Sequence, residues 1–277
     1  RKLTEEEIPL IISEKEQIIK KSGLLEYFHP KEFLSNVGGL DNLKDWIHKR
    51  GQAYSDDAKN FGLNIPRGVL LLGIPGCGKS LTAKAIANEW KFPLLRFDLG
   101  KVFGGIVGES ERNIRYALDV AKTISPCVLW IDEIEKGLSG SQSSGRTDGG
   151  TSARVFGTFL TWMQEKKEPV FVVATANDIS SLPPELLRKG RFDEIFFVDL
   201  PSAKERENIF DIHLKNKNRD AKALNLDMKE LVKKTEGFSG AEIEEVVNEA
   251  LFNAYAENQK DLQQNNLLEC ISETSPL

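Results

Sequence analysis

The sequence predicts an α/β fold: a doubly wound parallel sheet of five strands followed by a small all-helical domain. Two observations lead to this prediction. Short apolar runs alternate with longer stretches of helical period up to about residue 200, a pattern typical of strands connected by helices. Beyond about residue 201 the period is helical only. A chain of 277 residues is long enough to bury a large core and to form one or two domains.

Five apolar runs are the predicted strands. Runs such as VLLL and VFVV lack the alternation of apolar and polar residues that marks a half-exposed strand, so both faces of the sheet should be covered. The predicted strands are residues 68–73, 93–99, 127–132, 169–176 and 194–200. The helical period of KSLTAKAIANEW, SERNIRYALDVAKTI and TSARVFGTFLTWMQE predicts helices between them.

The chain is predicted to divide into three parts. Residues 1–30 form a flanking helical segment, in which a helix over 4–22 has acidic residues near its start and basic residues near its end, as the helix dipole favours. Residues 31–200 form the large α/β domain, and residues 201–277 form a small helical lid domain. The flanking helix either packs on the core or marks a link to a further N-terminal domain.

Composition narrows the function classes. The net charge is -5, with lysine and arginine scattered among acidic residues, which disfavours binding to nucleic acid or to an anionic membrane surface. No apolar run approaches the ~20 residues of a membrane span. The three cysteines, Cys77, Cys127 and Cys270, include no closely spaced pair, which argues against a disulfide framework or a zinc site. These features predict an intracellular protein in a reducing compartment.

The stretch GIPGCGKS follows an apolar strand and precedes a helix, and it fits the pattern GxxxxGK[ST] with Gly73, Gly78, Lys79 and Ser80. Glycines let backbone amides converge on phosphate oxygens, and the helix N-terminus adds partial positive charge. Lys79 is predicted to reach the β- and γ-phosphates, and Ser80 to bind Mg²⁺. Cys77 either packs and presents its amide, or has a lowered thiol pKa because it lies beside a helix N-terminus.

A second site is predicted in CVLWIDEIE, where an apolar strand ends in two carboxylates at the edge at which open α/β sheets bind ligands. Asp132 is predicted to complete the Mg²⁺ shell. Glu133, one residue further, points in another direction and is predicted to polarise a water for in-line attack on the γ-phosphate. Together with the phosphate loop, this acid pair predicts hydrolysis rather than binding alone.

A third polar group of residues follows the strand 169–176. The amide of Asn177 is predicted to hold the attacking water or the γ-phosphate beside the acid pair. Arg188 and Arg191 lie on either side of a Lys-Gly turn, and planar guanidinium groups suit the charge that develops during phosphoryl transfer. Their spacing is equally compatible with ordinary surface charge, and composition does not decide between the two.

Several stretches resemble the motifs of one family, the AAA ATPases, and the likeness covers residues 31–277. The stretches, in chain order, are NVGGLDNLK, GIPGCGKS, GIVGESERNIR, LWIDEIE, TAND, RKGRFD, IHLKN and GFSGAEI. The resemblance implies a P-loop NTPase fold with a helical lid, and ATP with Mg²⁺ as cofactors. The implied nucleotide contacts are Val37, Gly38, Gly73, Pro75, Gly76, Cys77, Gly78, Lys79, Ser80, Leu81, His213, Gly240 and Ala241.

The resemblance also implies an ATPase that works as a homo-oligomeric, usually hexameric, ring and remodels a protein client of unknown identity. In such a ring Arg188 and Arg191 act on the nucleotide of a neighbouring subunit. Flanking text such as GLLEYF and ISPCVLWIDE is most similar to family members encoded in plastid and cyanobacterial genomes, which implies the cytoplasm or the plastid stroma as the location.

One motif departs from the family pattern. Ile106, followed by Val107 and Gly108, stands where threading members present an aromatic residue to the client, and an aliphatic side chain offers less contact area. This departure favours an alternative function, a nucleotide-gated assembly or scaffold protein with slow turnover. A small-molecule kinase is disfavoured because the sequence indicates no acceptor pocket and the paired arginines would have no role.

Overall fold

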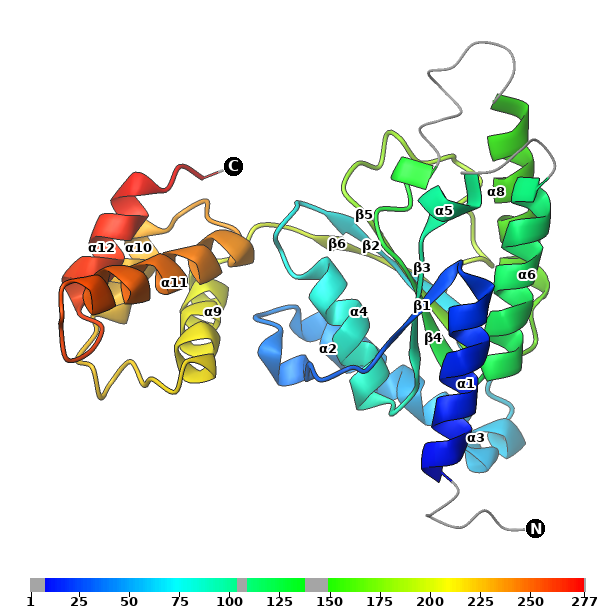
Figure 1. Ribbon diagram of the computed structural model, residues 1–277, viewed down its shortest axis with the longest axis horizontal. Helices are drawn as coiled ribbons and strands as arrows, with labels where there is room; N and C mark the ends of the chain where they lie inside the picture. Colours follow the sequence, from blue (N-terminus) through cyan, green and yellow to red (C-terminus); the bar gives the residue numbers. More distant parts are fainter. Residues whose placement is uncertain (1–7, 104–108, 138–148, 277) are drawn as a thin grey trace.

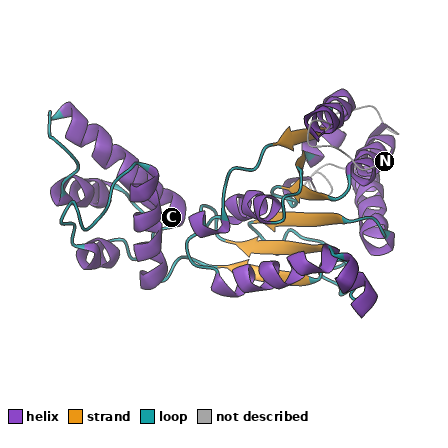
Figure 2. Ribbon diagram, turned by 90° about the horizontal axis from the view of Figure 1, so that it is seen from below, coloured by secondary structure: helices purple, strands orange, loops and turns teal. Residues whose placement is uncertain are grey.

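The computed structural model describes residues 8–103, 109–137 and 149–276 (Figure 1). A sheet covered by helices forms the larger part of the molecule, and a group of helices lies beside it, connected through the segment that follows strand β6. Figure 2 shows the same arrangement from below, with helices on both sides of the strands. The α/β fold with a separate helical part is therefore confirmed.

The sheet has six strands in the order β1-β3-β4-β5-β2-β6. The five runs predicted from the sequence all form strands, and they pair in parallel. The sixth strand, β1, was not predicted; it pairs antiparallel with β3 at the edge of the sheet. The strands are β1 Leu25–Phe28, β2 Gly68–Gly73, β3 Leu94–Phe97, β4 Cys127–Ile131, β5 Val170–Ala176 and β6 Glu194–Val198.

Each face of the sheet has its own core because successive residues of a strand point to opposite faces. Val69 and Leu71 of β2 belong to the core that α2 and α4 cover. Leu70 and Leu72 belong to the core that α1, α6 and α8 cover. The helices are α1 Ile8–Ser22, α2 Asp41–Gly51, α4 Lys79–Glu89, α6 Glu109–Ile124 and α8 Gly149–Glu165. The shorter helices are the 3-10 helices η1 Leu34–Asn36 and η2 Gln52–Tyr54 and the α-helices α3 Asp56–Phe61 and α5 Leu99–Phe103.

The helix before β1 packs on the sheet domain. Ile19 of α1 is fully buried in the same core as Leu25 of β1 and Leu95 of β3. The Nζ atom of Lys15 donates a hydrogen bond of 3.0 Å to the carbonyl oxygen of Ile124, at the end of α6. The flanking helix therefore packs on the core of the sheet domain.

The helices after β6 enclose a third core of their own, which includes Phe210, Leu231, Val247 and Leu267. Polar residues cap these helices at their N-termini. Ser202 and Ser239 form capping boxes with acidic residues three positions later, and the side chain of Asp227 accepts hydrogen bonds from two backbone amides. The helices are α9 Ala203–Asn216, α10 Met228–Lys234, α11 Gly240–Ala256 and α12 Gln264–Glu273. We call this group the lid.

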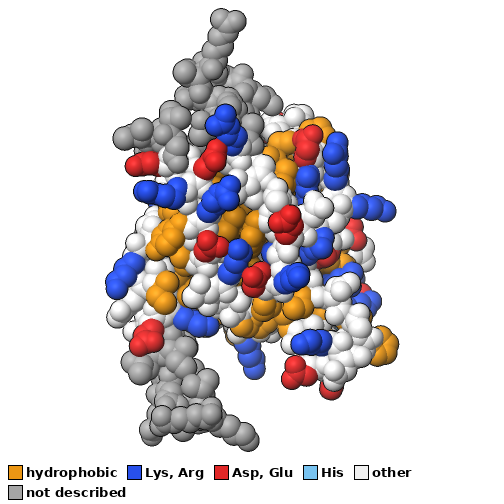
Figure 3. Space-filling model, turned by 90° about the vertical axis from the view of Figure 1, so that its right-hand side faces the viewer, with side chains coloured by type: hydrophobic (Ala, Val, Ile, Leu, Met, Phe, Trp, Pro, Cys, Tyr) orange, Lys and Arg blue, Asp and Glu red, His pale blue; other side chains and the backbone are white. Residues whose placement is uncertain are grey.

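The right-hand side of Figure 1 is shown as a surface in Figure 3. Lysine and arginine side chains are mixed there with aspartate and glutamate, and apolar side chains lie between them. The described residues of this face therefore present no field of a single sign to a polyanion. Within the described ranges, no helix combines the length and the apolar character that crossing a membrane requires.

The lid core can be tested with one substitution. Phe210→Ala removes a fully buried ring, so we expect the free energy of unfolding of the lid to fall by about 3–5 kcal/mol in urea denaturation. The control is Phe252→Ala on α11, whose side chain is 69% exposed and whose loss should change stability by less than about 0.5 kcal/mol. Equal losses in the two variants would contradict the packing described here.

Candidate functional site

The phosphate loop connects the end of β2 to the start of α4, as the sequence predicts. Two glycines make its path possible. A Cβ atom on Gly73 would lie 1.9 Å from the carbonyl oxygen of Val198 in β6, so no side chain fits there. Gly78 precedes α4 with a φ of 83°, a left-handed conformation that favours glycine. A Cβ built on Gly78 meets no atom within 4 Å, so the loop backbone borders open space at this point.

Lys79 lies beneath this loop and is only 6% exposed. Its ammonium donates hydrogen bonds of 2.7 Å to the carbonyl oxygens of Gly73 and Ile74. Burial lowers the pKa of Lys79 below its usual value, and the carboxylates of Glu135, Asp132 and Glu133 nearby oppose this shift. The loop therefore holds a buried cation next to three acids.

The predicted Mg²⁺ ligands lie together. Asp132 follows β4, and its Oδ1 atom accepts a hydrogen bond of 2.9 Å from the hydroxyl of Ser80, at the start of α4. The hydroxyl of Thr175 on β5 donates a second hydrogen bond of 2.7 Å to the same oxygen. Proteins commonly bind Mg²⁺ with one or two such oxygens, while phosphate oxygens and water complete the octahedron. Ser80 and Asp132 are therefore suitably placed for the ion.

Glu133 has an unusual backbone conformation for a residue with a side chain, with a φ of 48°. Its amide donates to the hydroxyl of Thr175 over 3.0 Å. Its Oε1 atom accepts a hydrogen bond of 3.1 Å from the side-chain amide of Asn177, and its Oε2 atom lies 2.5 Å from Nζ of Lys136. Both carboxylate oxygens of Glu133 are therefore held, one by the predicted partner Asn177 and one by a lysine that the sequence did not single out.

Two polar residues at this site were missed in the sequence. Thr175 joins the acid pair, and Glu135 accepts a hydrogen bond of 2.9 Å from the backbone amide of Asn177. Glu135 is 8% exposed, and its Oε2 atom has no hydrogen-bond partner among the described residues. A signal for Thr175 exists in the sequence, since it is the one polar residue in the otherwise apolar run VFVVATA.

These residues line one cavity of about 240 Å³ at the carboxyl ends of the strands. It is bounded by Pro75, Gly76, Gly78, Lys79, Ser80, Leu81, Asp132, Glu133, Thr175 and Asn177. A buried ammonium, loop amides and two acids in one cavity fit a polyphosphate with its divalent cation. The geometry thus brings together residues that the sequence placed in three separate motifs.

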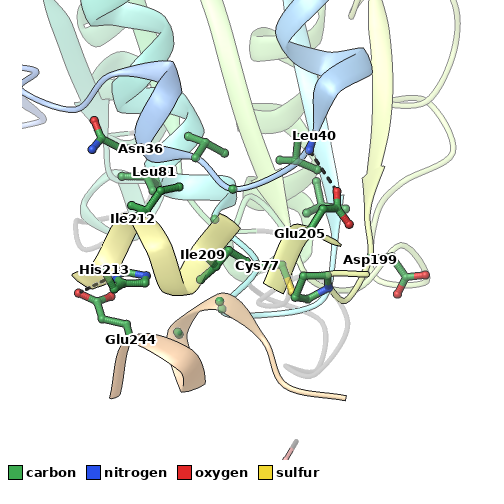
Figure 4. A pocket seen from close by; sticks show the side chains of 18 residues that line it. Asn36, Leu40, Cys77, Leu81, Asp199, Glu205, Ile209, Ile212, His213 and Glu244 are labelled. Carbon is green, nitrogen blue, oxygen red and sulfur yellow. Dashed lines mark hydrogen bonds and ion pairs between the residues drawn. The ribbon is translucent and has the colours of Figure 1, made fainter. Parts of the chain in front are cut away.

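A second cavity, of about 220 Å³, borders the first and shares the lining residues Gly76, Gly78 and Leu81 with it. Its walls come from the segment before α2, from the phosphate loop and from the lid helices α9 and α11 (Figure 4). The implied nucleotide contacts that line it are Val37, Gly38, Gly76, Cys77, Gly78, Leu81, His213, Gly240 and Ala241. Ile209 and Ile212 of α9, which the sequence did not single out, add apolar surface. A largely apolar pocket joined to a phosphate cavity suits a nucleoside triphosphate.

The lid is held against the rest of the site by direct contacts. The amide of Ala241 donates to the carbonyl oxygen of Gly76 over 3.0 Å, and the amide of Leu40 donates to Oε1 of Glu205 over 3.3 Å. A Cβ on Gly38 would lie 2.3 Å from Cγ1 of Ile209, so α9 approaches this segment too closely for a larger residue. The lid therefore contacts both the phosphate loop and the segment that borders the nucleoside pocket.

Two titratable side chains of this pocket are perturbed by burial. Burial lowers the pKa of His213, although Glu244 lies 4.0 Å away and acts in the opposite direction. Burial raises the pKa of the Cys77 thiol, and the charge of Lys79 only partly opposes this. The alternative of a reactive, low-pKa thiol at Cys77 is therefore wrong.

Other predicted functional residues lie elsewhere. Arg188 is exposed and Arg191 is partly buried, and neither lines the two cavities. The Nη1 atom of Arg191 is buried and has no hydrogen-bond partner among the described residues. The predicted client-binding stretch Ile106, Val107 and Gly108 lies outside the described residues.

Two family models match the chain one after the other. The model of the ATPase family associated with various cellular activities (AAA) matches residues 69–200, which contain the phosphate loop, the acid pair and Asn177. The model of the AAA+ lid domain matches residues 225–269. The chain belongs to the AAA family of ATPases.

Individual relatives support the same family. This AAA chain is 51% identical over 277 residues to a protein of Guillardia theta named uncharacterized AAA domain-containing protein ycf46; the match covers 100% of the chain and 54% of the relative. A protein of the same name from Pyropia yezoensis is 54% identical over 253 residues, covering 91% and 51%. A putative cell division cycle ATPase of Plasmodium falciparum is 36% identical over 229 residues, covering 78% and 18%. The chain spans about half the length of the ycf46 relatives.

The close approach of α9 to the segment before α2 predicts the effect of Gly38→Ala. The added Cβ would force Ile209 away from the nucleoside pocket, so we expect ADP affinity to fall by about tenfold in calorimetric titration, as for a lost contact of ~1.4 kcal/mol. Gly157→Ala on α8 is the control, since a Cβ there meets nothing within 4 Å and ADP binding should not change. Unchanged binding by both variants would show that this approach does not shape the pocket.

Proposed function

We propose that this AAA protein is a Mg²⁺-dependent ATPase that works as an oligomeric ring and couples hydrolysis to the remodelling of a protein partner. The observation that carries the proposal is the convergence of Lys79, Ser80, Asp132, Glu133 and Asn177 on one cavity that shares a wall with an apolar pocket suited to a nucleoside. The proposed location is the cytoplasm or the plastid stroma, with no nucleic-acid partner and no membrane span.

Each residue has a proposed role in binding. Lys79 and the loop amides bind the β- and γ-phosphates, and the apolar walls of the second cavity hold the base. Ser80 and Asp132 hold Mg²⁺, which when bound neutralises charge that develops on the phosphate oxygens. The low exposure of Lys79 supports this role, because water competes little with phosphate for a buried ammonium.

Glu133 is the proposed base that orients the attacking water. Its carboxylate is held by the side chain of Asn177, so the acid and the amide can contact the same water and the same γ-phosphate. Each carboxylate oxygen has two lone pairs, so the attacking water binds beside the present partners or replaces one of them. Of the two contacts of Glu133, the solvent-exposed ion pair with Lys136 is easier to break than the hydrogen bond to Asn177, because solvent screens an ion pair at the surface.

The location of Arg188 and Arg191 supports a ring. Since neither arginine lines the cavities of its own chain, the proposed role is to stabilise charge on the nucleotide of a neighbouring copy. Head-to-tail contacts of this kind close into rings when the rotation between copies allows it. A hexamer is the proposed assembly, and the stretch Ile106 to Gly108 is the proposed contact with the client.

A second candidate function is a nucleotide-gated assembly or scaffold protein that turns over slowly. One observation favours it: both carboxylate oxygens of Glu133 already have a partner, Asn177 or Lys136, which leaves fewer lone pairs to activate a water. Turnover and retention of ATP distinguish the two candidates.

The first experiment measures steady-state ATPase activity per subunit over a range of protein concentrations, with and without Mg²⁺. We expect activity to require Mg²⁺ and to rise as the chain assembles, because the arginines act between copies. Glu133→Gln should bind ATP normally and fail to release phosphate. If the wild-type protein itself retains ATP for hours, the scaffold function is favoured, and turnover that is independent of assembly would contradict the ring.

The second experiment tests whether Arg191 acts between copies. Arg191→Ala and Lys79→Ala should each lower kcat, the arginine variant by about 10³-fold or more. In an equimolar mixture, a subunit with an intact Lys79 meets a neighbour with an intact Arg191, and activity should recover to about a quarter of wild type. The control mixture of Lys79→Ala with Glu133→Gln should stay inactive, since both defects lie in the subunit that binds the nucleotide. No recovery in the first mixture would place Arg191 outside the neighbour's site.

A further inference from the structure

We propose that Thr175 is a positioning residue for hydrolysis, because its hydroxyl fixes the metal-binding carboxylate residue Asp132 and the proposed base Glu133 relative to each other. The inference rests on the proposed ATPase function and gives a role to Thr175, the first residue of the stretch TAND, to which the sequence analysis assigned none. It extends the site from the two adjacent acids that follow β4 to the neighbouring strand β5.

The hydroxyl of Thr175 uses both of its hydrogen-bonding capacities on this acid pair. It donates its proton to Oδ1 of Asp132 over 2.7 Å and accepts the amide proton of Glu133 over 3.0 Å. The residue is 1% exposed, so water does not compete for either contact. A hydroxyl has a single proton to donate, so Thr175 donates to Asp132 and to no other acceptor in this arrangement.

The backbone conformation of Glu133 explains why this contact matters. A residue with a side chain seldom adopts a φ of 48°, and such a conformation persists when the surroundings hold it in place. The Thr175 hydroxyl holds the amide of Glu133, and the Thr175 carbonyl oxygen accepts the amide of Ile134 over 2.9 Å. One residue of β5 therefore holds two successive amides at the turn that directs Glu133 toward Asn177.

Loss of the hydroxyl should change hydrolysis without changing nucleotide binding. Asp132 would keep its contact to Ser80, but the amide of Glu133 would lose its acceptor, and the two acids would move independently. Lys79 and the lid do not contact the Thr175 hydroxyl, so binding of the phosphates and the base should persist. The expected signature is a lower kcat at an unchanged affinity for nucleotide.

The variants are Thr175→Val, which removes the hydroxyl and keeps the branched shape, and Thr175→Ser, which keeps the hydroxyl. We expect Thr175→Val to lower kcat by about 10–100-fold, as is typical when a partner of a metal ligand is lost, and to change ADP affinity by less than about twofold. Thr175→Ser should retain most of kcat. The control is Thr235→Val, since Thr235 is equally buried and its hydroxyl donates to the carbonyl oxygen of Leu231 in the lid, far from the acids.

A second measurement does not depend on ATP. Amide hydrogen exchange of Glu133, followed by NMR in protein without added nucleotide, reports on the hydrogen bond to the Thr175 hydroxyl. We expect faster exchange at this amide in Thr175→Val than in wild type, Thr175→Ser and Thr235→Val. Thermal unfolding of all four proteins shows whether the variants are folded.

The outcomes separate this inference from the proposed function. A wild-type protein with no Mg²⁺-dependent turnover would overturn the ATPase function, while exchange at Glu133 would still report whether Thr175 holds the acid pair. If the wild type is active and Thr175→Val keeps more than half of its kcat, the positioning role is wrong. A loss of ADP affinity equal to the loss of kcat, or an equal loss in Thr175→Ser, would also contradict it, because a general disturbance of the site would then explain the effect.

Discussion

The parallel pairing of β2, β4 and β5 is the constraint on which the whole site depends. Because these strands run in one direction, the phosphate loop after β2, the acid pair after β4 and Asn177 after β5 leave the sheet at the same edge. The strands that carry them are buried on both faces, so their ends cannot shift independently. An antiparallel arrangement would place at least one of these groups at the opposite edge.

The charged groups at the carboxyl ends of these strands interact strongly because they are wholly or partly buried. Lys79 is removed from solvent and is surrounded by carbonyl oxygens and carboxylates. Neutral donors contact both members of the acid pair beside it: Ser80 and Thr175 bind Asp132, and Asn177 binds one oxygen of Glu133, whose other oxygen pairs with the ammonium of Lys136. Neutral donors fix the direction of a carboxylate without removing its charge. The cavity therefore presents two carboxylates to a cation and the ammonium of Lys79 to a phosphate, and all three groups have fixed positions.

The lid is a second packed unit of the fold, and it borders the same site. Its core is separate from the two cores of the sheet, so it can keep its internal packing while its contacts to the sheet domain change. Those contacts include the hydrogen bond from Ala241 to Gly76 of the phosphate loop and the one from Leu40 to Glu205. A nucleotide in the second cavity would contact both the sheet domain and the lid, so its binding would favour lid positions in which both sets of contacts form.

Local periodicity and motif spacing were sufficient to predict the five parallel strands, the helical lid, the phosphate loop and the acid pair. The remaining features arise from contacts between segments that are distant in the chain. Strand β1 has four residues and forms by pairing with β3, about seventy positions away, so no local pattern marked it. Thr175 and Glu135 gain their contacts only when β4 and β5 lie side by side. Burial, which depends on the whole fold, set the pKa of Cys77 in the direction opposite to that expected from its helix.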